Sequence, residues 1–180
     1  MSRTIFGKGS HSLVVLDALQ AMYPIDPIEM IDDEDGHRPK DTTMLICAIG
    51  DNRVRKEVGG MLTVIHPSAT VSSAAEIGQG VFIGANVMIA PKAKIGNGVI
   101  CNNAAVVEHE CTLGDYCHIA SGAVLSGNVT IGEGALIGAN AVVKLGKTVG
   151  PWAIVGCGAV VIRDVAGGLI VAGNPAKRLM

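Results

Sequence analysis

Residues 106–118, with the sequence VVEHECTLGDYCH, gather several side chains that can carry out chemistry. They include two histidines, two glutamates, one aspartate and two cysteines. Taken alone, these residue types are compatible with a metal site, a redox pair or an acid–base centre. The choice depends on where each side chain points, and therefore on the elements that carry this segment.

A six-residue repeat sets those directions. From Ile65 to Ala166 the chain divides into 17 consecutive hexads. Their first position is Ile, Val or Leu in 16 cases, and their fifth is Ala, Val or Cys in 16, with Lys147 as the exception. Glycine takes the second position in eight hexads, where we expect a tight turn with positive φ. A period of six fits neither a helix nor an alternating strand, so it predicts short strands joined by regular corners, with the first and fifth positions in the core.

This pattern resembles the hexapeptide-repeat, left-handed parallel β-helix, in which three hexads form one triangular coil. The resemblance implies between five and six coils over residues 65–166. Neighbouring coils should lie ~4.8 Å apart, as parallel strands do. The left-handed crossover is taken from the family, since parallel crossovers are otherwise right-handed.

The first 64 residues follow a different pattern and predict a small Rossmann-like β-α-β domain. Its glycine-rich loop, GKGSHS at residues 7–12, would present backbone N–H groups to a phosphate or a sugar. The expected strands are RTIF, IEMI and MLICAIG, and the expected helices are LVVLDALQAM and DNRVRKEVGG. Residues 167–180 are expected to form a C-terminal tail.

Composition narrows the function classes. The net charge of −2 gives no electrostatic reason to bind nucleic acid or an anionic membrane. No signal peptide is visible, and no apolar run approaches the ~20 residues that span a bilayer, so membrane insertion is not expected. The five cysteines form no C-x-x-C pair, which is typical of a reduced, cytoplasmic protein.

The hexad register gives each reactive side chain a direction. Cys111 and Cys117 occupy fifth positions and point into the core, where they act as small apolar filler. His109, Glu110 and His118 occupy outward positions. The two histidines lie on different faces of a coil, so no metal is expected.

An acid–base centre is the best interpretation of His109, although a solvated surface pair is the alternative. Gly127 follows His109 by 18 residues, which is one coil, and should lie about 5 Å further along the axis. Acyl transfer needs at least a general base and a nearby backbone N–H, because the base removes a proton from the nucleophile and the N–H stabilises the oxyanion.

Several motifs together resemble a known family over nearly the whole chain. They are the glycine loop with its histidine, the segments IDD, AIGDNRVRK and VIHPSA, an asparagine seven residues before His109 in EHEC, and the closing GNPAKRL. The chain is similar to bacterial nucleotide-sugar N-acetyltransferases, of the UDP-4-amino-sugar kind that forms UDP-N,N'-diacetylbacillosamine, within a sialic acid O-acetyltransferase-like family. The resemblance implies acetyl transfer from acetyl-CoA to the 4-amino group of a UDP-linked amino sugar, in bacterial glycan biosynthesis.

The resemblance also implies that the domain of residues 1–64 binds the sugar nucleotide and that the tail of residues 167–180 contributes to CoA binding. It further implies roles for individual residues. His109 would be the general base, with Glu110 as its orienting partner. Substrate binding would fall to His11, Asp32, Asp33, Asn102 and His118. Acetyl-CoA would be bound by the backbone amides of Gly127 and Cys157 and by the side chains of Lys177 and Arg178. Two serines replace glycines of the family loop, which leaves the identity of the sugar open.

The family forms homotrimers with active sites between protomers. His109 and His118 are half a coil apart, so we expect them to face one cavity from two protomers. Two alternatives stay open at this point. In the first, the acetyl acceptor is a hydroxyl group of a sialic acid or of another sugar. In the second, the chain is a non-catalytic hexapeptide-repeat scaffold.

Overall fold

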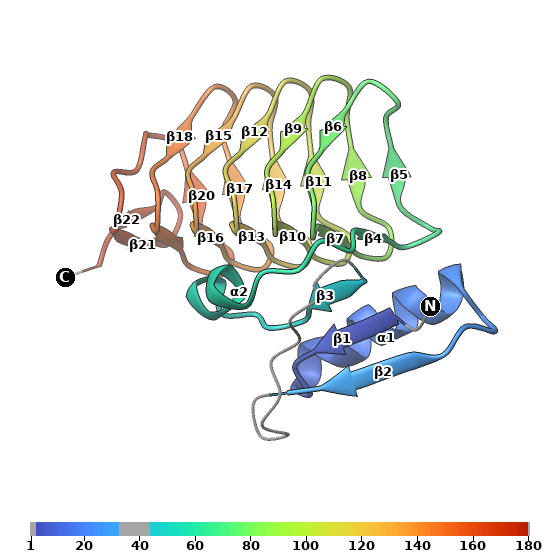
Figure 1. The fold of residues 1–180 in the computed structure, drawn as a ribbon. Helices are drawn as coiled ribbons and strands as arrows, with labels where there is room; N and C mark the ends of the chain where they lie inside the picture. The colour runs from blue at the N-terminus through green and yellow to red at the C-terminus, as the bar shows by residue number, and fades with distance from the viewer. Residues whose placement is uncertain (1–2, 33–43, 180) are drawn as a thin grey trace.

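The computed structural model of the chain describes residues 3–32 and 44–179, so Asp33 lies outside the described residues. Its main body is a parallel β-solenoid, and a small α/β unit built from the N-terminal residues lies against one side of it (Figure 1). The predicted β-helix is therefore confirmed.

The solenoid is triangular, and two-residue strands form its three faces. The first face contains β4 (Val64–Ile65), β7 (Phe82–Ile83), β10 (Ile100–Cys101), β13 (His118–Ile119), β16 (Leu136–Ile137) and β19 (Ile154–Val155), and is extended by β21 (Ile170–Ala172) and β22 (Lys177–Arg178). The second contains β5 (Thr70–Val71), β8 (Met88–Ile89), β11 (Val106–Val107), β14 (Val124–Leu125), β17 (Val142–Val143) and β20 (Val160–Val161). The third contains β6 (Glu76–Ile77), β9 (Lys94–Ile95), β12 (Thr112–Leu113), β15 (Thr130–Ile131) and β18 (Thr148–Val149).

The strand register follows the hexads. Val106 pairs with Val124 and Val107 with Leu125, so each residue lies beside the one 18 positions later. First-position side chains such as Val107 and Leu125 point inward and are fully buried. The fifth-position thiols of Cys111 and Cys117 are also buried, as predicted.

The predicted positive φ at second-position glycines is wrong, because the left-handed backbone occurs at the fourth position instead. Examples are Glu110 (φ 61°) and Tyr116 (φ 57°). The second-position glycines serve close approach between coils. A Cβ at Gly114 would lie 2.6 Å from the backbone nitrogen of Glu133, and one at Gly132 would lie 2.4 Å from that of Pro151. A side chain at this position would therefore push the coils apart.

The outward, sixth-position residues differ between the three faces. Those of the third face are polar and exposed, namely Glu76, Lys94, Thr112, Thr130 and Thr148. Those of the second face are mostly aliphatic, namely Thr70, Met88, Val106, Val124, Val142 and Val160. On the first face the outward residues Val64, Phe82 and Ile100 are buried beneath the N-terminal unit, whereas Ile154 is 38% exposed and Ile170 46%.

The N-terminal unit is a three-stranded parallel sheet in the order β2-β1-β3, with one helix between its first two strands. Its elements are β1 (Arg3–Phe6), α1 (Ser10–Met22), β2 (Ile28–Ile31), β3 (Leu45–Cys47) and α2 (Asn52–Val58). Val15 and Leu19 of α1 pack with Phe82 and Ile100, which joins this unit to the first face. Neither helix within residues 3–32 and 44–179 has the length and hydropathy that crossing a lipid bilayer requires.

Candidate functional site

His109 and Glu110 form a close side-chain pair at the corner between β11 and β12. His109 Nδ1 lies 3.2 Å from Glu110 Oε2, and the two side chains are 53% and 52% exposed. Glu110 adopts the left-handed backbone of a fourth position, which turns its side chain back beside the preceding residue. Its other oxygen lies 3.9 Å from the ammonium group of Lys92, one coil earlier. The carboxylate therefore lies between a cation and the imidazole.

Gly127 lies directly against the imidazole of His109. A Cβ at Gly127 would come within 2.5 Å of both Nε2 and Cε1 of His109, so only glycine leaves room for the ring in this position. The N–H of Gly127 donates no hydrogen bond within the described part of the chain. At three other corners this N–H donates to the side chain one coil later, as from Gln79 to Asn97, but the corresponding residue here is Leu145, whose side chain has no acceptor. A backbone N–H without a partner among the described residues thus lies beside the imidazole of His109.

A second pair of histidines lies between the N-terminal unit and the first face. The ring centroids of His11 and His118 are 6.2 Å apart, and His11 makes an edge contact with Phe82 at 5.4 Å. The Nε2 atoms of both rings are buried without a hydrogen-bond partner among the described residues. Burial, followed by the charge of Arg55, lowers the pKa of each imidazole to about 4. Both rings are therefore neutral near pH 7 and have free polar atoms.

His11 belongs to a pocket of about 450 Å³ at the carboxyl ends of β1 and β3. The glycine-rich loop at residues 7–11 forms one wall, and Asp32 and residues 48–50 complete it. Ser10 and Ser12, which replace family glycines, belong to the first turn of α1, and Ser12 Oγ donates to Gly9 O at 2.6 Å.

The other predicted site residues lie away from His109 within one chain. Asn102 is one coil before the strand of His118, and its backbone N–H donates to Ile119 O at 2.8 Å. Cys157 is exposed at the corner between the first and second faces. Lys177 and Arg178 are exposed in β22, at the C-terminal end of the solenoid (Figure 1). The structure thus brings His109, Glu110 and Gly127 together, and separately His11 and His118.

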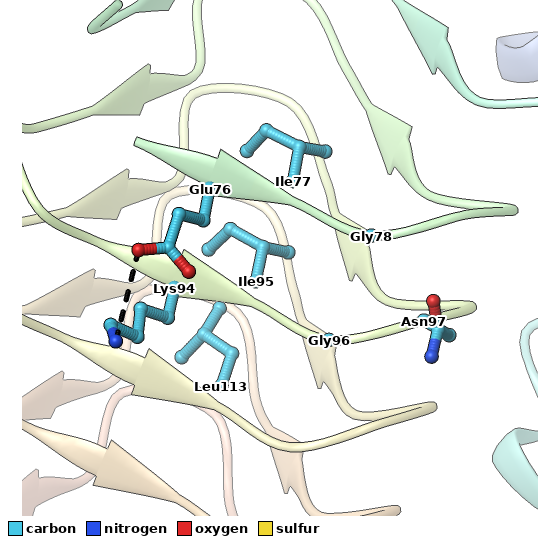
Figure 2. A pocket seen from close by; sticks show the side chains of 8 residues that line it. All are labelled: Glu76, Ile77, Gly78, Lys94, Ile95, Gly96, Asn97 and Leu113. Atoms are coloured by element: carbon cyan, nitrogen blue, oxygen red, sulfur yellow. Dashed lines mark ion pairs between the residues drawn. The ribbon is translucent and has the colours of Figure 1, made fainter. Parts of the chain in front are cut away.

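A further pocket, of about 340 Å³, opens on the third face (Figure 2). Glu76 and Lys94 form an exposed ion pair across neighbouring coils at 3.7 Å, and Asn97 Oδ1 already accepts a hydrogen bond from Gln79. No histidine, serine, threonine or cysteine lines this pocket. Its only charged side chains, Glu76 and Lys94, are paired with each other, and no second acid or base accompanies them.

The chain is similar to a known protein family and to several solved structures. The family model "Bacterial transferase hexapeptide (six repeats)" matches residues 74–103, 92–127 and 110–145. The acetyltransferase domain of PglB from Neisseria gonorrhoeae, in complex with acetyl coenzyme A, is 35% identical with a TM-score of 0.91, over 99% of this chain and 98% of that one. The chain belongs to the hexapeptide-repeat acetyltransferases.

Two other similar structures extend this result. PerB from Caulobacter crescentus, in complex with CoA and GDP-perosamine, is 35% identical with a TM-score of 0.92, over 100% of this acetyltransferase and 98% of PerB. WeeI from Acinetobacter baumannii is 27% identical with a TM-score of 0.91, over 99% and 100% of the two chains. A search of curated protein sequences gave no significant match. The solved relatives align with both parts of this acetyltransferase.

Two residues beside the candidate site residues were not predicted from the sequence. Arg55 is 1% exposed and lies beside the His11–His118 pair. Lys92 pairs with Glu110. The hexad register could have found Lys92, because it precedes Glu110 by 18 residues, whereas Arg55 is only one of several charges on a short helix.

Proposed function

We propose that this chain transfers the acetyl group of acetyl-CoA to the 4-amino group of a nucleotide-linked amino-deoxy sugar, in bacterial glycan biosynthesis. The closeness of the His109 imidazole to Gly127, whose N–H donates no hydrogen bond within the described residues, supports this most directly. Relatives that bind acetyl-CoA, or CoA together with GDP-perosamine, support the two substrates.

The reaction needs a base, an oxyanion donor and a leaving-group acid. The amine nitrogen of the sugar attacks the carbonyl carbon of the thioester, and Nε2 of His109 accepts the proton that this nitrogen loses. The carbonyl oxygen becomes an oxyanion that accepts a hydrogen bond from the N–H of Gly127. The intermediate then breaks the carbon–sulfur bond, and the departing thiolate takes the proton from His109. The products are the N-acetylated sugar nucleotide and CoA.

Glu110 acts on the base. Its carboxylate accepts from Nδ1–H of His109, which fixes the tautomer with Nε2 free to receive a proton, and it stabilises the imidazolium that forms. The exposure of both side chains in one chain allows substrate to reach Nε2.

The sugar nucleotide occupies the pocket of the N-terminal unit, which we interpret as a Rossmann-like domain. The glycine loop faces the phosphates, and His11 and Asp32, together with Asp33 beyond the described residues, hold the nucleotide or the sugar. His118 and Asn102 contact the sugar. UDP as the carrier stays a prediction from the sequence, because PerB binds a GDP-linked sugar.

Acetyl-CoA runs along the solenoid towards its C-terminal end. Gly127 and Cys157 both have backbone N–H groups that donate no hydrogen bond within the described residues, which suits contacts to the thioester and the pantetheine arm. Lys177 and Arg178 are exposed cations in β22, placed to meet the CoA phosphates.

The active enzyme is a homotrimer, with each site shared between protomers. The first face of the solenoid is covered by the N-terminal unit, and the third face is polar. The second face presents an aliphatic row that includes Val106, Val124 and Val142, and it lies beside the corner that carries His109. Burial of this row between protomers would bring His109 of one chain towards His118 of the next. Such a face is what an oligomer interface requires.

The test is acetyl transfer with a panel of nucleotide-linked 4-amino sugars on UDP, GDP and dTDP carriers. CoA release is followed with a thiol reagent, and the product is examined by NMR for an amide or an ester. We expect CoA release and an amide at C4 with at least one member of the panel. An ester would replace the amine acceptor with a hydroxyl, and no CoA release from any amino or hydroxyl sugar would favour the scaffold alternative.

A further inference from the structure

Arg55 is a buried cation whose hydrogen-bond partners are neutral. Its side chain is 1% exposed, and within the described residues its guanidinium forms no hydrogen bond to a carboxylate. Burial of an unpaired charge is costly unless its donors are satisfied. Here burial lowers the pKa of Arg55 to about 10, so the guanidinium still carries its charge near pH 7. A buried charge of this kind needs a reason beyond packing.

The donors of Arg55 reach in two directions. Towards the N-terminal unit, Nη1 donates to Ile49 O at 2.9 Å and Nη2 to Asn52 Oδ1 at 2.9 Å. Towards the solenoid, Nε donates to Gly98 O at 2.7 Å and Nη2 to Tyr116 O at 2.7 Å. One rigid, planar group therefore joins both parts of the molecule.

The joined segments carry the two sides of the proposed sugar-nucleotide site. Ile49 lines the pocket that contains the glycine loop and His11. Tyr116 lies two residues before His118, in the corner that leads into β13. The distance from the pocket to the ring of His118 thus depends on the contacts of Arg55.

We propose that Arg55 is a positioning residue for the sugar nucleotide, holding the pocket loop at residues 48–50 at a fixed distance from His118. This proposal rests on the function proposed above. Lysine cannot replace Arg55 in this role, because a single ammonium cannot reproduce the fork of donors that reaches both segments.

The electrostatics agree with this role. Arg55 contributes, after burial, to the lowered pKa values of His11 and His118. The other groups that act on His118 are His11, which lowers its pKa, and the Gly50 backbone, which raises it. Both imidazoles are therefore held neutral, and the Nε2 atom of each, which has no partner among the described residues, can bond a hydroxyl or amide group of the sugar.

The test compares Arg55→Lys with Arg53→Lys, an arginine on the exposed side of the same helix. For Arg55→Lys we expect the KM for the nucleotide sugar to rise about tenfold or more, while the KM for acetyl-CoA changes less than about twofold. Arg53→Lys should leave both constants unchanged. Titration of the histidines by NMR should show the His118 resonance of Arg55→Lys displaced from that of the wild type.

A loss of kcat with both KM values unchanged would overturn the proposal, because it would indicate only a smaller folded fraction. If Arg55→Lys does not fold, Asn52→Ala removes one acceptor of the guanidinium and should raise the sugar KM by a few-fold; an unchanged KM there would also overturn it. A wild-type protein inactive on every nucleotide sugar would refute the proposed function instead, and the NMR comparison would still decide whether Arg55 positions His118.

Discussion

The imidazole of His109 lies so close to the backbone of Gly127 that a Cβ atom at residue 127 would be 2.5 Å from Nε2. Nothing in the backbone of Gly127 demands glycine, since its φ is not positive. The imidazole of the neighbouring coil leaves no room for a side chain, so glycine is needed here because of His109 and not because of the turn.

Replacement of Gly127 by alanine should therefore displace the ring without unfolding the solenoid. We expect kcat to fall by about tenfold or more, because a shift of the base by an ångström is costly in a proton transfer. Thermal unfolding provides the control. The destabilisation by Gly127→Ala should diminish in a His109→Ala background, where the clash is absent, and equal costs in both backgrounds would contradict the contact.

Glu110 is expected to help the base without replacing it. Glu110→Gln keeps a polar group beside Nδ1 but removes the charge that stabilises the imidazolium, and we expect kcat to fall about tenfold. Lys92→Asn is the matched control, since Lys92 contacts the same carboxylate at 3.9 Å, is exposed, and asparagine tolerates its left-handed backbone. Because exposed ion pairs are weak, its kcat should stay within about threefold of the wild type. A similar fall in kcat in both variants would indicate that the local charge matters in general and that Glu110 has no specific role beside His109.

The buried histidines predict acid sensitivity of the fold. In the folded chain the pKa values of His11 and His118 are about 4, below the ordinary histidine value of 6.5. Between these values the unfolded chain binds more protons, so the free energy of unfolding decreases as the pH falls from about 6.5 to about 4, by roughly 3 kcal/mol at most for each histidine. Chemical denaturation across this range measures the loss. His118→Gln should have a shallower dependence on pH, and an unchanged slope would contradict the assignment.

Shared sites predict complementation between inactive variants. Trimers mixed from His109→Ala and His118→Ala chains contain an interface at which an intact His109 faces an intact His118. Co-expression and purification of mixed trimers should restore acetyl transfer that neither variant has alone. Absence of any recovery in verified mixed trimers would place both histidines in the same protomer's site, or remove one of them from the site.

Much of this geometry follows from the six-residue repeat. Because core side chains recur at the first and fifth positions, the repeat predicts that His109 points outward and that Gly127 neighbours it one coil later. Both are observed. The start of α2 was also predictable, since Asp51 caps it through the N–H groups of Arg53 and Val54. The predicted start of the first helix is wrong, because α1 begins at Ser10, inside the segment expected to be a loop, and not at Leu13. The role of second-position glycines was not, because close approach between coils depends on packing and not on local dihedral preference.

The repeat cannot tell which face is covered. His118 occupies an outward position and would be exposed on a bare solenoid, but it lies beneath the N-terminal unit because α1 packs against the first face. Arg55 is a charged residue in a short polar helix, and only the tertiary structure reveals that coil carbonyls surround its guanidinium. Lys147 interrupts the fifth-position pattern, yet its backbone keeps the regular bond from Thr130 and its ammonium lies 4.0 Å from Asp164.

The central claim is that His109 is the base of acetyl transfer, and the turnover of His109→Ala tests it most directly. With the wild type's preferred nucleotide sugar and saturating acetyl-CoA, we expect kcat to fall roughly a hundredfold or more while the circular dichroism spectrum and the oligomeric state stay those of the wild type. A folded His109→Ala protein that turns over at the wild-type rate would contradict the account.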